Sequence, residues 1–296
     1  MYFKIYNTYF KCNVSLSDFG INCINSLPKK ISPIEIDFCK SDLNQHLNYV
    51  DNETMVKNDY GYYFSKKNGL YEFIEGKKIK VNYFYNIDND LLQILLNYPI
   101  GAILYQKNYY VMHASSVKFD NKIICFCGQS MSGKSSLVAK LISEGGKLIS
   151  EDTSIFSFTN KDILIHPSYP FIKISNEVKN FTDLSTSTKV NFKKKINNRP
   201  GFILNPNQFE EKTKIVDAFI FLTWGDGKEL ISRVSAKESL TLLLSNNFFN
   251  TFSNDQLVMI FNRSSFISRR CSFFQYNRKK DFNNLNSFIP KLRQYL

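Results

Sequence analysis

The sequence predicts an α/β fold in which a β-rich N-terminal domain, residues 1–86, precedes a larger domain, residues 87–296. Three observations predict it. Stretches of alternating apolar and polar residues dominate the first part, strand and helix patterns alternate in the second, and a glycine-containing loop at 128–135 joins an apolar strand to a helix. With 296 residues, 43 % of them hydrophobic, the chain can bury a sizeable core.

The first 86 residues predict strands joined by tight turns. Tyr2–Tyr6 and Ile34–Phe38 alternate as half-buried strands do. Asn68-Gly69 and Glu75-Gly76 are typical of hairpin turns. These turns separate three further expected strands, Tyr60–Phe64, Tyr71–Ile74 and Ile79–Tyr85.

The helical pattern begins near Asp88. An apolar stripe at positions 91 to 96 predicts a helix that Pro99 bends or ends, with a second helical stretch at Ala102–Gln106. Two strands, Tyr110–Val117 and Lys122–Cys127, then flank a turn.

The C-terminal part alternates strands and helices. The continuous apolar run Val216–Trp224 is typical of a central strand. Ser235–Glu238 and Ser253–Gln256 are capping boxes that predict two helices. A last strand, Cys271–Tyr276, and an amphipathic helix, Phe282–Leu292, close the chain.

The net charge is +12, which favours an anionic ligand or simply a lysine-rich surface. The densest basic runs, Lys193–Lys195 and Arg278–Lys280, are interpreted as solvated faces. Because no recognition helix, zinc finger or aromatic-basic RNA motif accompanies them, binding to nucleic acid rests on charge alone and is the weakest interpretation.

Six scattered cysteines favour reduced thiols and a cytoplasmic protein. Cys125 and Cys127 lie on alternate positions of an apolar run, so we expect both to pack on one face of a buried strand rather than to bind metal. The N-terminus lacks a signal-peptide core and no stretch reaches transmembrane length, so no membrane association is expected.

Chemistry is expected first at Gly128–Ser135, which fits the P-loop pattern G-x-x-x-x-G-K-[ST]. The preceding apolar strand Ile123–Cys127 and the helix from Ser136 provide the strand–loop–helix context. In such a loop successive backbone amides face phosphate oxygens, Lys134 reaches the β- and γ-phosphates, and the Ser135 hydroxyl binds Mg²⁺. The loop therefore predicts binding of ATP and Mg²⁺.

Two adjacent acids, Glu151 and Asp152, end the next expected strand. A strand–loop–helix–strand unit should return this strand beside the P-loop strand, which would bring both acids close to Lys134. One acid could hold Mg²⁺ and the other could accept the proton of an attacking hydroxyl. The alternative is a solvated acidic turn.

Two histidines are candidates for the same site. His113 lies in the strand expected to neighbour the P-loop strand, and we weigh a catalytic and a structural role for it evenly. His166, before a proline, is the weaker candidate.

Together these residues resemble a known family. His113-Ala114-Ser115-Ser116, the P-loop and the acidic pair resemble the catalytic domain of HPr kinase/phosphorylase, which is similar to the nucleotide core of phosphoenolpyruvate carboxykinase. The resemblance is closer to the HPr-kinase-related proteins of bacterial peptide natural-product clusters, including lasso-peptide kinases. It covers most of the chain and is specific from 111 to 154. Further similar segments are 90–106 followed by 110–117, His166–Pro170 and the region near Tyr276.

The resemblance implies roles for particular residues. Glu151 would be the catalytic base that activates the acceptor serine, Asp152 would assist the metal with Ser135, and His113 would line the pocket beside Lys134. The residues implied to bind ATP are Gly128, Ser130, Ser132, Gly133, Lys134, Ser135 and Ser136.

Three departures from the family pattern matter. The family shows paired aspartates, whereas Glu151 stands first here and is one methylene longer. Met131 replaces a glycine that such loops usually have. No Glu-x-Arg-Gly segment occurs between 155 and 215, which argues against recognition of HPr and against the phosphorylase reaction.

The favoured hypothesis is an ATP- and Mg²⁺-dependent kinase that phosphorylates a serine or threonine of a peptide or small protein, within a peptide-modification pathway. The alternatives are a kinase for a small-metabolite hydroxyl and a nucleotide-binding regulatory module with little turnover. Homo-oligomerisation stays open. The polar, lysine-rich stretch Ser175–Pro200 has no clear periodicity and is weighed evenly as a lid over the site or a mobile surface loop.

Overall fold

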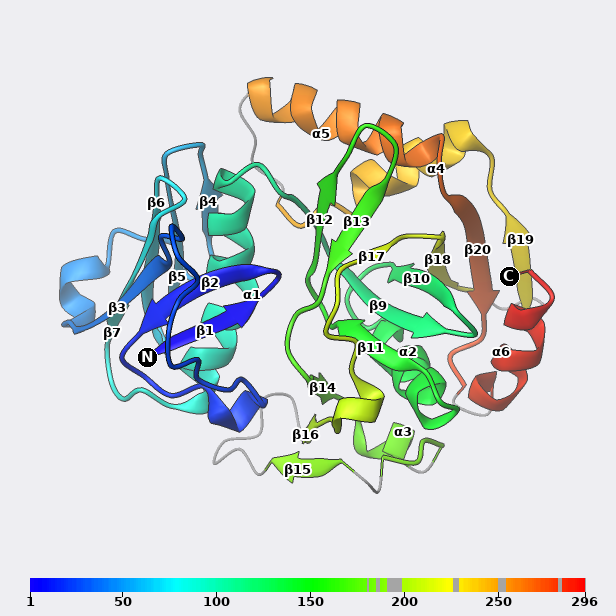
Figure 1. The fold of residues 1–296 in the computed structure, drawn as a ribbon, viewed down its shortest axis with the longest axis horizontal. Helices are drawn as coiled ribbons and strands as arrows, with labels where there is room; N and C mark the ends of the chain where they lie inside the picture. The colour runs from blue at the N-terminus through cyan, green and yellow to red at the C-terminus, as the bar shows by residue number, and fades with distance from the viewer. Residues whose placement is uncertain are drawn as a thin grey trace.

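The computed structural model shows a mixed α/β protein with several sheets (Figure 1). It describes residues 1–179, 181–184, 187–190, 199–225, 229–249, 254–281 and 284–295. The N-terminal strands and one long helix lie on one side, and the remaining elements lie on the other. In the described part of the chain, no helix is both long and apolar enough to cross a membrane.

The N-terminal part forms a seven-stranded sheet in the order β1-β2-β3-β7-β6-β5-β4. Strands β2, β3 and β7 run parallel to one another, and the other neighbours are antiparallel. The strands are β1 Tyr2–Ile5, β2 Thr8–Cys12, β3 Ile34–Lys40, β4 Thr54–Val56, β5 Tyr60–Ser65, β6 Gly69–Ile74 and β7 Lys78–Tyr83. All five expected strands are present, and β2 and β4 are additional.

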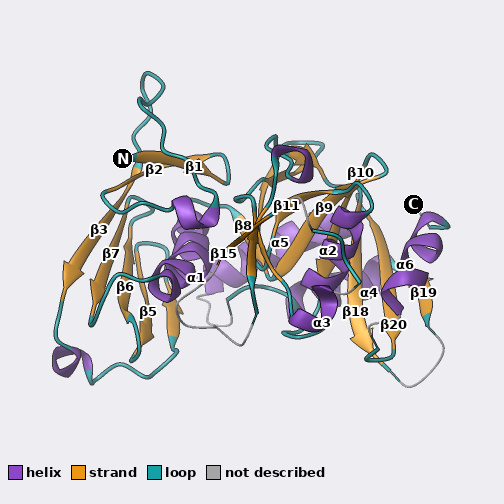
Figure 2. Ribbon diagram, turned by 90° about the horizontal axis from the view of Figure 1, so that it is seen from below, coloured by secondary structure: helices purple, strands orange, loops and turns teal. Residues whose placement is uncertain are grey.

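Helix α1, Asn89–Gln106, packs against β5, β6 and β7 and also reaches the rest of the chain (Figure 2). The Asp88 side chain caps it by accepting a hydrogen bond from the Leu91 amide (3.0 Å). The helix continues through Pro99, so the expectation of two helical stretches was wrong; tertiary packing of its buried residues outweighs the lost hydrogen bond. Because α1 contacts both parts, the domain boundary at residue 86 stays a prediction.

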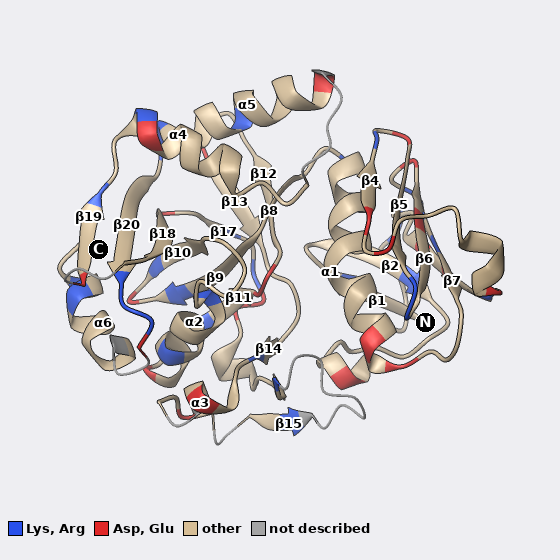
Figure 3. Cartoon of the chain, turned by 180° about the vertical axis from the view of Figure 1, so that it is seen from behind, with Lys and Arg blue, Asp and Glu red and all other residues tan. Residues whose placement is uncertain are grey.

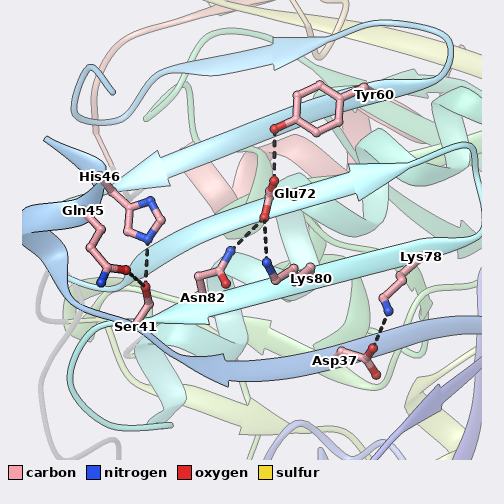
Figure 4. Close-up of polar contacts among 9 residues, drawn as sticks. All are labelled: Asp37, Ser41, Gln45, His46, Tyr60, Glu72, Lys78, Lys80 and Asn82. Atoms are coloured by element: carbon pink, nitrogen blue, oxygen red, sulfur yellow. Dashed lines mark hydrogen bonds and ion pairs between the residues drawn. The ribbon is translucent and has the colours of Figure 1, made fainter. Parts of the chain in front are cut away.

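Polar contacts tie together neighbouring strands of the N-terminal sheet (Figure 4). The Glu72 carboxylate accepts hydrogen bonds from the Tyr60 hydroxyl (3.1 Å) and from the side-chain amide of Asn82 (2.8 Å). It also forms an ion pair with Lys80. Since Tyr71 and Phe73, on either side of Glu72 in β6, are buried, the sheet shows the alternation expected of a half-covered sheet.

The larger part is built around a six-stranded sheet in the order β11-β9-β10-β18-β20-β19. Strands β10, β18 and β20 are parallel, and β9, β11 and β19 are each antiparallel to their neighbour. The strands are β9 Ala114–Phe119, β10 Lys122–Cys127, β11 Lys147–Ser150, β18 Ala218–Trp224, β19 Leu230–Arg233 and β20 Ser272–Arg278.

Helices cover both faces of this sheet. On one face, α2 (Lys134–Ser143) and α6 (Asn284–Arg293) pack over Ile124 and Phe126; on the other, α4 (Ala236–Ser245) and α5 (Asn254–Ser268) share a core with Cys125 and Cys127. The two cysteines are fully buried on one face of β10, as expected. The core that contains Cys125 and Cys127 continues through α1 into the N-terminal sheet.

The chain passes from one sheet to the other at two short breaks between consecutive strands. β8 (Tyr110–Met112) and β9 are separated only by His113, and β11 and β12 (Ser154–Phe158) only by residues 151–153. Strands β8 and β12 belong to a four-stranded sheet, β17-β13-β12-β8, with β13 Ile163–His166 and β17 Lys214–Ile215. Each break therefore places its side chains where the two sheets diverge.

The prediction that the strand before Glu151 lies directly beside the P-loop strand was wrong. Strand β11 runs in the same direction as β10, but β9 lies between them and pairs with both. The acids at the end of β11 still reach the P-loop, because the loop and the helix after it extend over β9.

The segment Ser175–Pro200, which was weighed evenly as a lid or a mobile surface loop, contains short elements among its described residues, and both roles stay predictions. A three-stranded sheet has the order β14-β16-β15, and α3 follows β14. The bounds are β14 Phe171–Lys173, α3 Asn176–Lys179, β15 Thr188–Val190 and β16 Gly201–Ile203. Lys193–Lys195 lie outside the described residues, as does Ser253 of the second capping box and the start of the last expected helix, residues 282–283.

Candidate active site

The loop Gly128–Ser135 joins β10 to α2. Gly128, Met131 and Gly133 adopt positive φ angles of 150°, 64° and 87°. A β-carbon on Gly133 would lie 2.0 Å from the Arg278 guanidinium, so Arg278 would have to move, and the positive φ would strain any other residue. Met131, in the place of the usual glycine, also adopts the left-handed conformation and projects outward.

The Lys134 side chain lies inside this loop and is 5 % exposed. Its ammonium donates to the carbonyl oxygens of Gly128 (2.8 Å) and Gln129 (3.2 Å), and it lies 2.9 Å from Nε2 of His113. Those three contacts match the three N–H donors of the ammonium. Burial lowers the pKa of Lys134, and nearby acids oppose that shift.

His113 is fixed in one tautomer by its two partners. Nδ1 lies 3.0 Å from the backbone carbonyl oxygen of Asp152, which can only accept, so Nδ1 carries the proton. Nε2 is then free to accept from the Lys134 ammonium. Burial and the Lys134 charge both lower the pKa of His113, which favours the neutral ring.

The acidic pair lies in a tight turn. The Thr153 amide donates to the Glu151 carbonyl oxygen (2.7 Å) around Asp152, whose φ is +61°, which is the rare left-handed form of the γ-turn. The Ser115 hydroxyl accepts from the Asp152 amide (3.3 Å). This strained turn breaks the strand so that the two acids project in different directions.

Glu151 contacts the end of the P-loop. Its Oε1 accepts a 2.8 Å hydrogen bond from the Ser135 hydroxyl, and the residue is 8 % exposed. Burial, with the neighbouring charge of Asp152, raises the pKa of Glu151 to about 7, although Lys173 and the Ser135 hydrogen bond act in the opposite direction.

A cavity of about 550 Å³ opens beside the loop. Basic side chains outnumber acidic ones in its wall, which suits an anionic ligand. Elsewhere Lys and Arg are spread over many elements (Figure 3). The cavity is lined by Tyr98, His113, Ser130, Met131, Gly133, Lys134, Ser135, Ser136, Asp152, Lys173, Ile174, Ser175, Glu177, Arg199, Trp224, Arg278, Lys280 and Asp281.

The structure thus brings the residues expected at the site together. His113, Lys134, Ser135 and Asp152 line the cavity, and Glu151 lies behind Ser135. Ser130, Gly133 and Ser136 line it as well. Gly128 and Ser132 form the inner side of the loop instead. Among the described residues, the buried Ser132 hydroxyl has no hydrogen-bond partner.

Several lining residues were not expected at the site from the sequence, among them Lys173, Trp224 and Arg278. Arg278, expected on a solvated face, is 3 % exposed and donates to the Ser132 carbonyl oxygen (3.0 Å). The strand that carries Arg278 ends beside the P-loop. The run of basic residues Arg278–Lys280 by itself does not indicate that position. Trp224 is the one tryptophan of the chain and ends the predicted central strand, so its position was the available signal.

The second histidine lies elsewhere. His166 contacts the hydroxyls of Ser157 (2.8 Å) and Thr213 (3.0 Å) in the four-stranded sheet, and burial lowers its pKa to about 4. Its partners and burial explain it as a structural residue.

The donors at the loop suit Mg²⁺, an ion that keeps several waters and takes only one or two carboxylates together with substrate phosphates. Ser135 and Glu151 are in contact, and Asp152, the next residue, lines the same cavity as Ser135. In the described part of the chain, no cluster of three or more His, Cys, Asp or Glu side chains forms a metal cage.

Among known proteins, similarity was found only at the level of solved structures. No protein-family model matches the sequence, and no curated protein matches it. Among solved structures, the chain is similar to the Hpr(Ser) kinase/phosphatase from Coxiella burnetii, with a TM-score of 0.34 and 12 % identity. That likeness covers 62 % of this chain and 95 % of the other.

Proposed function

We propose that the protein is an ATP- and Mg²⁺-dependent kinase that transfers the γ-phosphate to a serine or threonine hydroxyl of a peptide or small protein. We further propose that its core is a P-loop core of the HPr kinase type, related to the tailoring kinases of peptide natural-product clusters. The sequence motifs of residues 111 to 154 support that relationship.

One observation carries the proposal: Ser135 donates its hydroxyl hydrogen bond to Glu151 at 2.8 Å. The contact joins the last residue of the P-loop to a carboxyl group whose pKa is raised to about 7. A base is most effective when its pKa lies near the working pH, and an unperturbed carboxylate would be a weak base there. A glycine turn without a ligand would not need this pairing.

In this mechanism the backbone amides of Gly128–Ser135 and the Lys134 ammonium bind the phosphates. The acceptor hydroxyl gives its proton to Glu151 while its oxygen bonds to the γ-phosphorus, and the bond to the β–γ bridging oxygen breaks to release ADP. Mg²⁺, held by Ser135 with an adjacent acid, would neutralise charge on the phosphates. His113 accepts a hydrogen bond from the Lys134 ammonium and so helps to hold it at the loop.

The same geometry supports a second assignment of the two acids. Glu151 touches Ser135, the expected metal ligand, whereas Asp152 faces the cavity. Glu151 would then assist the metal and Asp152 would accept the proton. Asp152→Asn and Glu151→Gln separate the two: loss of transfer with the Mg²⁺ requirement unchanged identifies the base, and a raised Mg²⁺ requirement identifies the metal partner.

The size of the cavity bears on the acceptor. A volume of about 550 Å³ lies within the range that one small ligand fills, so bound nucleotide would leave an acceptor to approach from the mouth. This supports a peptide or protein acceptor over a small metabolite enclosed beside the nucleotide.

The test is mass spectrometry of peptides encoded beside the gene, incubated with the protein, ATP and Mg²⁺. The proposal expects one added phosphate on a serine or threonine, and no addition with Lys134→Ala. Phosphorylation of a small metabolite but of no peptide would overturn the acceptor class. Bound ATP without any transfer would favour a regulatory module.

A further inference from the structure

The cavity wall opposite the acids is aromatic and cationic. Trp224 ends β18 and Arg278 ends β20, and the two residues are direct partners in the parallel pairing of these strands. Both strands lie on one side of the P-loop strand β10, whereas β9 and β11, which lead to His113 and Glu151, lie on the other. The loop is thus flanked by acids on one side and by this pair on the other.

Arg278 is a rigid support for the indole of Trp224. Its guanidinium lies 4.5 Å from the centre of the indole ring, is 3 % exposed, and donates to the Ser132 carbonyl oxygen of the P-loop. A cation over an aromatic face stabilises the pair most when water is excluded. This contact therefore holds the indole beside the loop.

Trp224 itself stays open to the cavity. It is 41 % exposed and lines the cavity together with Gly133 and Arg278. Its ring would lie 3.6 Å from a β-carbon on Gly133, so the indole adjoins the start of α2, where phosphates are expected. An indole face that is exposed inside a cavity offers a stacking surface to a flat ligand group.

We propose that Trp224 is the stacking platform for the nucleobase, with Arg278 as its positioning residue. This inference rests on the proposed function, because it assigns the second half of the same ligand. Every base has a flat π-face, so an indole recognises the base by area and contact rather than by a hydrogen-bond pattern. Purine nucleotides should accordingly bind in preference to inorganic tripolyphosphate, and ATP and GTP should bind similarly.

The experiment compares ATP, GTP and inorganic tripolyphosphate, each with Mg²⁺, by calorimetry on the full chain and on Trp224→Ala and Trp224→Phe. Trp224→Ala is expected to bind ATP roughly tenfold or more weakly while its affinity for tripolyphosphate stays unchanged. Trp224→Phe keeps an aromatic face and should retain most of the affinity. Because the chain has one tryptophan, its emission reports this residue alone, and ATP should quench it more than tripolyphosphate does.

The outcomes separate this inference from the proposed function. Equal affinity of wild type and Trp224→Ala for ATP overturns the platform while the phosphate site stands. Equal weakening for ATP and tripolyphosphate also overturns it, since Trp224 would then only support the loop. If wild type binds neither ligand, the proposed function and this inference fall together.

Discussion

The hydroxyl of Tyr6 donates a 3.0 Å hydrogen bond to the carbonyl oxygen of Thr153, 147 residues away in the chain. Tyr6 lies in the turn between β1 and β2, its φ is +50°, and its amide donates to the Pro167 carbonyl oxygen (2.7 Å). Thr153 closes the strained turn that carries Glu151 and Asp152. The N-terminal sheet therefore braces the acidic turn directly.

Tyr6→Phe should lower both stability and turnover. It leaves a buried carbonyl oxygen without its donor, which costs about 1–2 kcal/mol of unfolding free energy. Because that carbonyl belongs to the acidic turn, we expect kcat to fall more than KM for ATP rises. Urea unfolding and steady-state kinetics measure both effects. Tyr9→Phe, on the same hairpin, is the matched control, and equal effects of the two variants would contradict the bracing role.

Glu151 should make stability depend on pH. Its folded-state pKa, about 7, lies above the ordinary 4.5, so the folded state holds the proton more tightly. The stabilisation is complete below pH 4.5 and is lost as pH rises through 7. Glu151→Gln should remove this loss and raise the unfolding free energy at alkaline pH by roughly 3 kcal/mol, since one pKa unit corresponds to about 1.4 kcal/mol. Melting curves across pH check it, with exposed Glu144→Gln as control.

The rate of transfer should follow the same titration if Glu151 is the base. Only the ionised carboxylate accepts a proton, so kcat/KM, which reports groups of the free enzyme, should rise with pH through about 7. Glu151→Gln should bind ATP and lose transfer. A pH–rate profile that keeps this limb in the glutamine variant would place the base elsewhere, first at Asp152 and then at His113.

Lys134→Ala should abolish phosphate binding and leave the fold intact. The ammonium is the cation inside the loop, and loss of one such group typically lowers turnover by about 10²-fold or more. Calorimetry with tripolyphosphate and circular dichroism test the two halves of this prediction. Lys140→Ala, on the same helix but paired with Glu144, should leave phosphate binding unchanged.

Gly133→Ala should be more disruptive than Gly145→Ala. Both glycines have positive φ, 87° and 93°, so both variants carry a backbone cost of about 1–2 kcal/mol. Only at Gly133 would the new methyl group collide, at 2.0 Å, with Arg278; at Gly145 there is nothing within 4 Å. Thermal melts of the two variants isolate the collision, and equal melting temperatures would show that Arg278 moves aside freely.

Local sequence patterns predicted many of the turns, helix caps and strands of this protein. Gly76 adopts the positive φ angle that glycine allows in a turn, and Ser235–Glu238 forms its capping box because that motif needs only neighbours in sequence. The P-loop also depends on adjacent residues, so its place between β10 and α2 was predictable. The elements between residues 153 and 215 are short and lack a clear periodicity, so the sequence did not predict them.

The sequence by itself therefore determined the residue types and the local conformation of contiguous segments: the loop with Lys134 and Ser135, the acids after it, and most of the strands and helices around them. Tertiary structure alone decided which distant residues meet there. Pairing of β18 with β20 brings Trp224 onto Arg278, and packing of the first hairpin brings Tyr6 to Thr153. These contacts depend on strand order and on burial summed over the whole core, and no local pattern in one sequence records either.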